Sequence, residues 1–206
     1  SALSANAPLA RCTSFRIGGP ADLLLTPTSV AMLAAALSTA RRIGLPVTIL
    51  GGGTNVLVSD RGVRGLVVRL GRAFDYRRWE PTDDGSCAVV EAGAATRLSK
   101  LVAEAVQRGY GGIEFAAGIP GSVGGGALMN TGAFGGELGD AIDCISGVTL
   151  AGEVVDLVRS RLDFSYRKLA LTDVLVITSA RFRLARSSTA KLRSTVQTVQ
   201  AKRRTK

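Results

Sequence analysis

The chain contains no histidine, and this absence narrows the chemistry open to it. Without an imidazole it has no Ser-His-Asp or Cys-His catalysis, no His-ligated zinc and no flavin bound covalently through histidine. Its three cysteines, Cys12, Cys87 and Cys144, are widely spaced and match no metal-ligand pattern. We therefore expect buried free thiols and no metal site.

Long apolar runs are also missing. No run approaches about 18 residues, and no charged-then-apolar leader opens the chain, so the sequence predicts no membrane span and, by default, a cytoplasmic location. With 206 residues, 46% of them hydrophobic, the chain is nevertheless long enough to bury a sizeable core.

The net charge of +10 is concentrated at one end of the chain. From Arg181 to Lys206 there are nine basic and no acidic residues, which leaves 17 basic against 16 acidic residues before them. A basic end raises the alternative of a nucleic-acid-binding module. However, the basic residues lack interleaved aromatics after Phe182 and the body is nearly neutral, so we expect no nucleic-acid partner.

Glycine, by contrast, is abundant in one stretch. Residues 112–136 contain nine glycines among apolar residues such as Ile113, Phe115 and Phe134. Glycine weakens helices and strands, so this density indicates backbone that must lie against something a Cβ would exclude. A surface linker would be polar, whereas these apolar side chains favour burial, so a bound ligand is the better interpretation.

A second glycine run, Gly51 to Gly53, directly follows the apolar segment Val47 to Leu50, which reads as a buried strand ending in a tight turn. Successive amides there are suited to an anion, so the two runs together suggest one extended phosphate-bearing cofactor held at two points. Neither run fits the G-x-G-x-x-G fingerprint, and a P-loop begun at Gly121 needs lysine where Ala127 stands. The sequence thus supports neither a Rossmann nor a P-loop site.

Several motifs, in order, resemble the UDP-N-acetylenolpyruvoylglucosamine reductase family, flavoenzymes that complete UDP-N-acetylmuramate for peptidoglycan. They span most of the chain and are Thr13-Ser14-Phe15-Arg16-Ile17-Gly18-Gly19-Pro20-Ala21, Leu50-Gly51-Gly52-Gly53-Thr54-Asn55-Val56-Leu57, Gly118-Ile119-Pro120-Gly121-Ser122-Val123-Gly124-Gly125, Met129-Asn130-Thr131-Gly132-Ala133-Phe134-Gly135 and Phe164-Ser165-Tyr166-Arg167. The resemblance implies an α+β fold, the two-part FAD-binding domain of the p-cresol methylhydroxylase and vanillyl-alcohol oxidase type.

The resemblance also implies noncovalent FAD and assigns its contacts. The first glycine loop would contact the pyrophosphate, and the later segments would line the pyrophosphate, ribityl chain and ring. The expected cofactor-binding residues are Gly51, Gly52, Gly53, Thr54, Asn55, Gly118, Ile119, Pro120, Gly121, Ser122, Gly124, Gly125, Asn130, Gly132 and Ala133.

For catalysis, the resemblance points to Arg167 and its neighbour Tyr166. In the implied reaction NADPH reduces FAD, and flavin N5 passes hydride to the enolpyruvyl double bond of a UDP-sugar substrate. A guanidinium suits the carboxylate next to the developing carbanion, because it stays charged and pairs bidentately. The family's proton-donating serine and a glutamate belong to a third domain whose motif does not occur here, so we expect a truncated FAD-binding fragment that is incomplete for catalysis. The alternative within enzymes is another FAD-dependent oxidoreductase of the same superfamily.

We expect three segments: subdomain 1 over residues 1–71, subdomain 2 over 72–184, and a basic, helical connector over 185–206. The first ten residues read as an arm lying on the body, and Ser29 and Thr96 as caps of two helices. A third helix is expected to begin at Pro120. The helices expected from periodicity are 30–43 and 97–107. The expected strands are 22–26, 47–50, 55–59, 65–70, 87–92, 145–150, 154–158 and 174–184.

Overall fold

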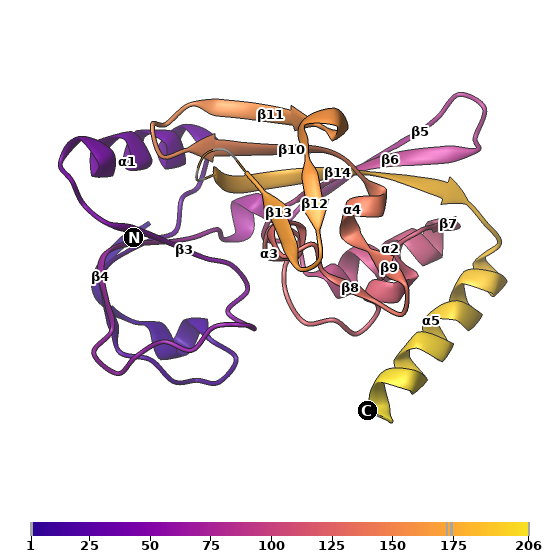
Figure 1. Cartoon of the computed structure of the whole chain (residues 1–206), viewed down its shortest axis with the longest axis horizontal. Coiled ribbons are helices and arrows are strands. Elements are labelled where there is room, and N and C mark those ends of the chain that lie inside the picture. Colours follow the sequence, from indigo (N-terminus) through magenta and orange to yellow (C-terminus); the bar gives the residue numbers. More distant parts are fainter. Residues whose placement is uncertain (1, 172, 174, 206) are drawn as a thin grey trace.

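The structure of the protein is a computed structural model that describes residues 2–171, 173 and 175–205. Ser1, Thr172, Val174 and Lys206, which fall within the expected segments, lie outside the described residues. Two β-sheets dominate the architecture (Figure 1). The smaller sheet and its helix occupy one end of the molecule, and the larger sheet extends from it toward the C-terminal helix.

The smaller sheet has the strand order β1-β2-β4-β3. Its strands are β1 (Leu3–Pro8), β2 (Pro20–Leu25), β3 (Val47–Leu50) and β4 (Val63–Arg69). β1 pairs with β2 antiparallel, whereas β2 and β3 both run parallel to β4. Because β2 connects to β3 through helix α1 (Val30–Arg42), this part is a β-α-β unit completed by β4.

The larger sheet is antiparallel, with the strand order β11-β10-β14-β6-β5 and the short β7 beside β14. Its strands are β5 (Arg77–Pro81), β6 (Cys87–Gly93), β7 (Tyr110–Gly111), β10 (Ile142–Thr149), β11 (Val154–Val158) and β14 (Leu175–Arg186). Two short hairpins lie apart from it: β8 (Gly132–Ala133) with β9 (Gly136–Glu137), and β12 (Asp163–Ser165) with β13 (Lys168–Ala170).

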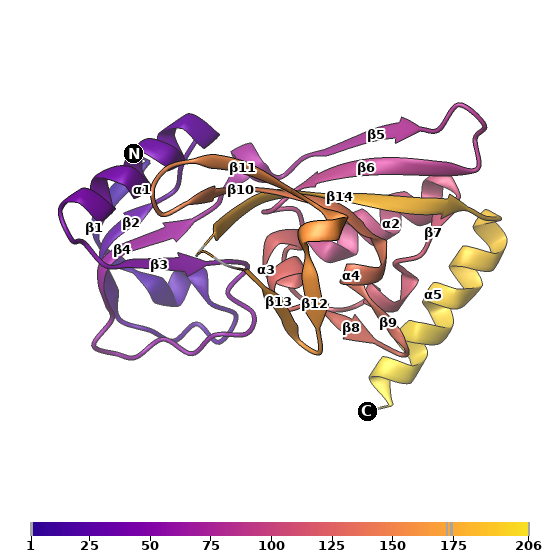
Figure 2. The same cartoon turned by 45° about the horizontal axis from the view of Figure 1, so that its top comes forward.

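Helices pack beneath the larger sheet (Figure 2). They are α2 (Leu98–Arg108), α3 (Val123–Leu128), α4 (Leu138–Ala141) and α5 (Thr189–Arg204), with 3-10 turns at Leu9–Cys12, Arg72–Phe74, Glu114–Ala116 and Arg159–Arg161. The main core joins the sheet to α2, for example through Phe182, Leu98 and Leu101, all of which are fully buried. None of the helices in the described part of the chain combines the length and apolarity needed to cross a membrane.

Helix α1 ties the two sheets together. Ser29 caps it as expected, its hydroxyl oxygen accepting from the Met32 amide at 3.1 Å. The buried Leu33 and Leu37 of this helix share one apolar cluster with strands of both sheets, including Val68 and Val176. Burial of a leucine side chain stabilises by about 1.5–3 kcal/mol, so these contacts help to set the sheets against each other.

Several expectations about local structure are wrong. Residues 55–59 form a loop rather than a strand: they pair with no strand, and Leu57 is 76% exposed. Thr96 does not cap α2, because its hydroxyl donates to the Tyr76 carbonyl at 3.0 Å and Arg97 takes the N-cap position without a side-chain cap. The third helix begins at Val123 rather than at Pro120.

Two strands were missed at the sheet edges. The opening segment forms β1, an edge strand of the smaller sheet. Residues 77–81 form β5, an edge strand of the larger sheet. All three cysteines are free thiols, with Cys12 and Cys144 buried and Cys87 half-buried. The division expected near residue 71 stays a prediction, as does the separate connector over residues 185–206.

Candidate functional site

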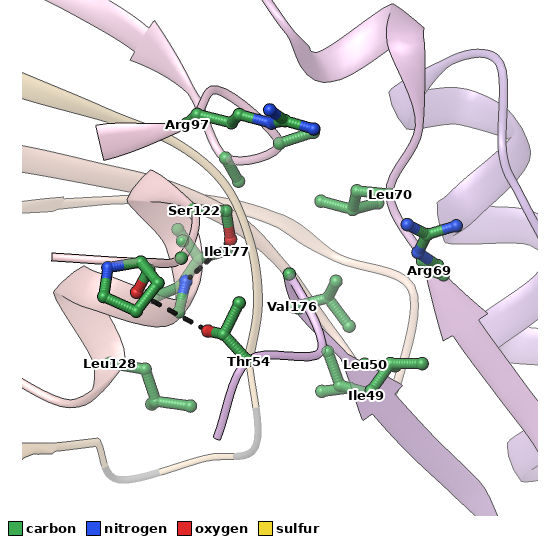
Figure 3. A pocket seen from close by; sticks show the side chains of 18 of the residues that line it. Ile49, Leu50, Thr54, Arg69, Leu70, Arg97, Ser122, Leu128, Val176 and Ile177 are labelled. Carbon is green, nitrogen blue, oxygen red and sulfur yellow. Dashed lines mark hydrogen bonds between the residues drawn. The ribbon is translucent and has the colours of Figure 1, made fainter. Parts of the chain in front are cut away.

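A cavity of about 460 Å³ lies between the two sheets (Figure 3). The end of β3, the glycine loop that follows it, the segment before α3 and the start of β14 surround this cavity. Its lining consists of Ile49, Leu50, Gly51, Gly52, Thr54, Arg69, Leu70, Ala94, Ala95, Arg97, Ser99, Ile119, Pro120, Gly121, Ser122, Gly124, Gly125, Leu128, Leu175, Val176 and Ile177. Its volume falls in the usual range for small-molecule and cofactor sites.

The cavity brings together the two glycine runs predicted from the sequence. The Thr54 hydroxyl donates to the Pro120 carbonyl at 3.5 Å, across 66 positions of sequence. A Cβ placed on Gly52 would lie 3.4 Å from the Gly121 Cα atom. The loops therefore approach each other closely at one side of the cavity, and both expose backbone to it.

Some glycines here are required by the fold. Gly53 has φ of +68°, and a Cβ on it would overlap the carbonyl oxygen of Cys12. Gly53 also fixes that neighbouring loop, because its carbonyl accepts from the Ser14 amide at 2.8 Å. A Cβ on Gly124 would lie 2.8 Å from the Cβ of Ala94, closer than side chains pack. Close packing explains these two positions without any ligand.

Other glycines of the lining have no such reason. Gly51 and Gly125 do not have positive φ values. A Cβ on Gly51 or Gly125 would come no closer than 3.6 Å to a neighbouring atom, an ordinary contact. Gly125 even lies inside helix α3, where alanine is the better helix former. The protein alone thus leaves these glycines unexplained, whereas a ligand lying against the backbone explains them.

The rest of the lining divides into an apolar and a cationic part. Eight branched side chains supply the apolar surface: Ile49, Leu50, Leu70, Ile119, Leu128, Leu175, Val176 and Ile177. The only charged residues among the described lining are Arg69 and Arg97. A flat ring system fits the apolar surface, and an anionic group fits the glycine amides and the arginines.

Sequence reasoning missed Arg69, Arg97 and the contribution of β14. Arg69 ends an apolar strand and Arg97 precedes a helix, positions at which arginines commonly face solvent. No signal in the sequence separates these two arginines from the other basic residues, because their approach to one cavity depends on how the sheets pack.

Apart from its two arginines, the described lining of this cavity holds only uncharged side chains, among them the hydroxyls of Thr54, Ser99 and Ser122. No Asp, Glu, Lys, Tyr or Cys occurs among the described residues that line it. The shifted pKa values belong elsewhere, for example to Glu104 of α2. Burial raises the pKa of Glu104, but hydrogen bonds from Arg77 and Arg108 outweigh burial and hold it below the ordinary value. The cavity is therefore suited to binding rather than to acid-base chemistry.

Asn130, expected at the cofactor, is 2% exposed, and its side chain bonds to protein. Its carbonyl oxygen accepts from the Gly139 amide at 2.9 Å, and its amide donates to Glu137 at 2.5 Å and to the Ser165 carbonyl at 3.0 Å. Through Ser165, Asn130 holds the β12-β13 hairpin. The other expected cofactor residues outside the lining are Gly53, Asn55, Gly118, Gly132 and Ala133.

Tyr166 and Arg167 form the two-residue turn of the β12-β13 hairpin, between the paired residues Ser165 and Lys168. Tyr166 is 80% exposed, and the Arg167 guanidinium carbon lies 5.6 Å from the centre of its ring. Arg167 has φ of +53°, a conformation that side chains rarely adopt outside turns and functional sites. The structure does not place either side chain in the lining of the cavity.

Comparison with known proteins decides the family. A family model described as FAD binding domain matches residues 21–157. The crystal structure of UDP-N-acetylenolpyruvylglucosamine reductase from Thermus caldophilus has a TM-score of 0.81 at 30% sequence identity, covering 99% of this chain and 69% of that one. The chain belongs to the UDP-N-acetylenolpyruvoylglucosamine reductase family. Its domain is an FAD binding domain, and its cofactor is FAD.

Curated reductases of the family extend the match. The UDP-N-acetylenolpyruvoylglucosamine reductase of Agathobacter rectalis is 36% identical over 203 residues, covering 95% of this chain and 64% of the relative. That of an Anaeromyxobacter species is 44% identical, covering 87% and 54%. The chain thus spans less than two thirds of the length of these relatives.

A more distant structure confirms the expected fold class. The VAO-type flavoprotein of Myceliophthora thermophila has a TM-score of 0.63 at 18% identity, over 81% of this chain and 32% of that one. At that identity the likeness concerns the fold alone. The α+β domain of the p-cresol methylhydroxylase and vanillyl-alcohol oxidase type, expected from the sequence, is therefore confirmed.

Proposed function

We propose that the cavity between the sheets holds FAD, and that this chain is the FAD-binding part of a UDP-N-acetylenolpyruvoylglucosamine reductase. The observation that carries the placement is the pair Gly51 and Gly125: they line the cavity, and neither backbone conformation nor packing requires glycine there. A cofactor lying against the backbone of both loops supplies the missing reason.

Different lining residues would hold different parts of such a cofactor. Backbone amides of the Gly51 to Thr54 loop and of Gly121 and Ser122 would face its phosphates, since the amides of Val123 and Gly124 already donate to protein carbonyls, and the apolar side chains would cover its rings. When bound, FAD supplies the hydride-transfer chemistry. The chain's own contribution is to bind, orient and partly shield that group, since the described lining holds no carboxyl, amine, phenol or thiol.

For the reaction, we propose reduction of a UDP-N-acetylglucosamine enolpyruvate to UDP-N-acetylmuramate with NADPH as reductant. Arg167 is the proposed partner of the substrate carboxylate, with Tyr166 beside it. An exposed guanidinium on a hairpin held by Asn130 is positioned to meet a group arriving from outside the cavity. The cytoplasmic location expected from the sequence stays a prediction.

Flavin binding tests the placement. The purified chain should take up FAD with visible flavin absorbance, and Gly125→Leu, which fills the cavity, should lose it. Ala35→Leu adds a leucine to the exposed face of α1 and serves as the matched control. Equal FAD binding by all three proteins would overturn the placement.

Turnover tests the reaction separately. NADPH should reduce the bound flavin, and the enolpyruvyl substrate should then reoxidise it in a full-length relative that carries this domain. Reoxidation only by oxygen, with no muramate product, would contradict the proposed substrate while leaving FAD binding intact.

A further inference from the structure

Two arginines stand on different sides of the cavity. Arg69 ends β4 in the smaller sheet, and Arg97 immediately precedes α2 below the larger sheet. In Figure 3, the Arg97 side chain extends from its own segment toward the side on which Leu70 and Arg69 lie. The cavity therefore has a cation at each of its two walls.

Neither guanidinium is neutralised by a carboxylate within the described residues. Arg97 makes no side-chain hydrogen bond or ion pair there, and the only such interaction of Arg69 is a hydrogen bond to the Cys12 sulfur, at 3.8 Å. By contrast, Arg77 of the larger sheet binds Glu104 at 2.7 Å and Asp75 at 3.0 Å.

This arrangement has an electrostatic consequence. No acidic residue of the described lining balances these two positive charges, so the cavity favours an anionic ligand. Guanidinium groups also match the geometry of phosphate oxygens, which they bind with paired hydrogen bonds.

We propose that Arg69 and Arg97 hold the diphosphate bridge of the cofactor from the two sides of the cavity, while the glycine amides contact the same bridge. This inference rests on the proposed placement of FAD in the cavity. On this inference, the two arginines make the chain bind FAD more tightly than a flavin that lacks phosphate.

The test compares FAD with riboflavin, which has the same ring system but no phosphate. Dissociation constants are measured by flavin fluorescence for the unmodified chain, Arg69→Gln, Arg97→Gln and Arg97→Lys, each at low and high salt. Arg193→Gln, an exposed arginine of α5 without a side-chain partner in the described chain, is the matched control for loss of one positive charge. Thermal unfolding of each cofactor-free variant shows that the fold is kept.

We expect Arg97→Gln and Arg69→Gln each to weaken FAD about tenfold or more, since hydrogen bonds to charged groups are the strong ones. Riboflavin affinity should change less than about twofold by the same reasoning, because the lost bonds concern phosphate. Arg97→Lys should recover only part of the loss, and salt should weaken FAD more in the unmodified chain than in the glutamine variants.

Three results would overturn the assignment. The first is unchanged FAD affinity in both glutamine variants while Gly125→Leu abolishes binding, which would leave the placement of FAD standing and remove the arginines from it. The second is an equal loss for FAD and riboflavin, which would indicate damage to the cavity rather than a lost phosphate contact. The third is weakened binding of UDP or NADPH with FAD unchanged, which would assign the arginines to a substrate diphosphate.

Discussion

Gly125→Ala should distinguish an effect on FAD binding from an effect on the stability of the fold, because the two effects have opposite signs there. Gly125 is the third residue of α3, where alanine is favoured over glycine by up to about 1 kcal/mol. A Cβ there meets only the Ser122 hydroxyl oxygen, at 3.6 Å, so packing adds no penalty. The cofactor-free protein should therefore become more stable, with Tm higher by about 2–4 °C for a chain of this size.

The same methyl group occupies the lining against which FAD is proposed to lie. A tenfold loss of affinity corresponds to about 1.4 kcal/mol. At saturating FAD, the stabilisation contributed by binding falls by that amount. This loss of binding free energy slightly exceeds the stability that the cofactor-free protein gains from alanine. The Tm should therefore rise in the absence of FAD and fall in its presence.

Thermal unfolding with and without excess FAD measures both effects in one experiment. Gly126→Ala is the matched control, because it lies next in the same helix but outside the cavity lining. Its Cβ would lie 2.9 Å from Leu138 and 3.1 Å from Leu98, so overpacking should lower Tm by a similar amount in both states. A Gly125→Ala protein that gains the same Tm with and without FAD would refute the reasoning.

Four further predictions follow from named contacts. Gly53→Ala should lower the free energy of unfolding by more than about 1 kcal/mol, because φ is +68° there; an unchanged denaturation midpoint would contradict this. Asn130→Ala should cost about 1–3 kcal/mol by leaving buried partners unpaired, and hydrogen exchange should show a loosened β12-β13 hairpin; exchange at the normal rate would argue against that role. Burial raises the pKa of Glu104, but the Arg77 hydrogen bond helps to bring it below 4.5, so this stabilisation is present above that pH and is lost as pH falls through the folded pKa. Arg77→Gln should therefore flatten the fall of Tm below pH 4.5, and parallel curves would count against the pair. In a full-length relative, the lysine variant at the position of Arg167 should keep flavin but turn over much more slowly, since lysine lacks the planar fork; normal kcat would remove this arginine from the mechanism.

Local signals in the sequence were sufficient for much of the fold. Ser29 predicted the start of α1, and the spacing of Leu33 and Leu37 predicted its buried face, because both signals act within one helix. The edge strand β1 gave no such signal. Five of its six residues are not buried, so it carries little of the alternation by which a half-buried strand is recognised.

The opposite error occurred at residues 55–59. The apolar Val56 and Leu57 resemble a buried strand, but the structure leaves them exposed in a loop beside the cavity. A pattern of apolar residues does not specify whether a pairing strand is available, since that depends on residues distant in sequence. The same limit applies to Arg69 and Arg97, which line one cavity only because of how the two sheets pack.

Glycine content alone did not identify the residues of the candidate site, because the glycines there serve two different purposes. Gly53 and Gly124 satisfy the backbone and its packing, so any side chain at these positions should damage the fold whether or not a cofactor binds. Gly51 and Gly125 face the cavity with room for a Cβ, so side chains there should disturb binding first. A ligand site is therefore indicated by the glycines that remain after those required by φ and packing are set aside. In this chain the remainder clusters around one cavity, on the loop after β3 and in helix α3, which is the arrangement that an extended cofactor spanning the two sheets demands.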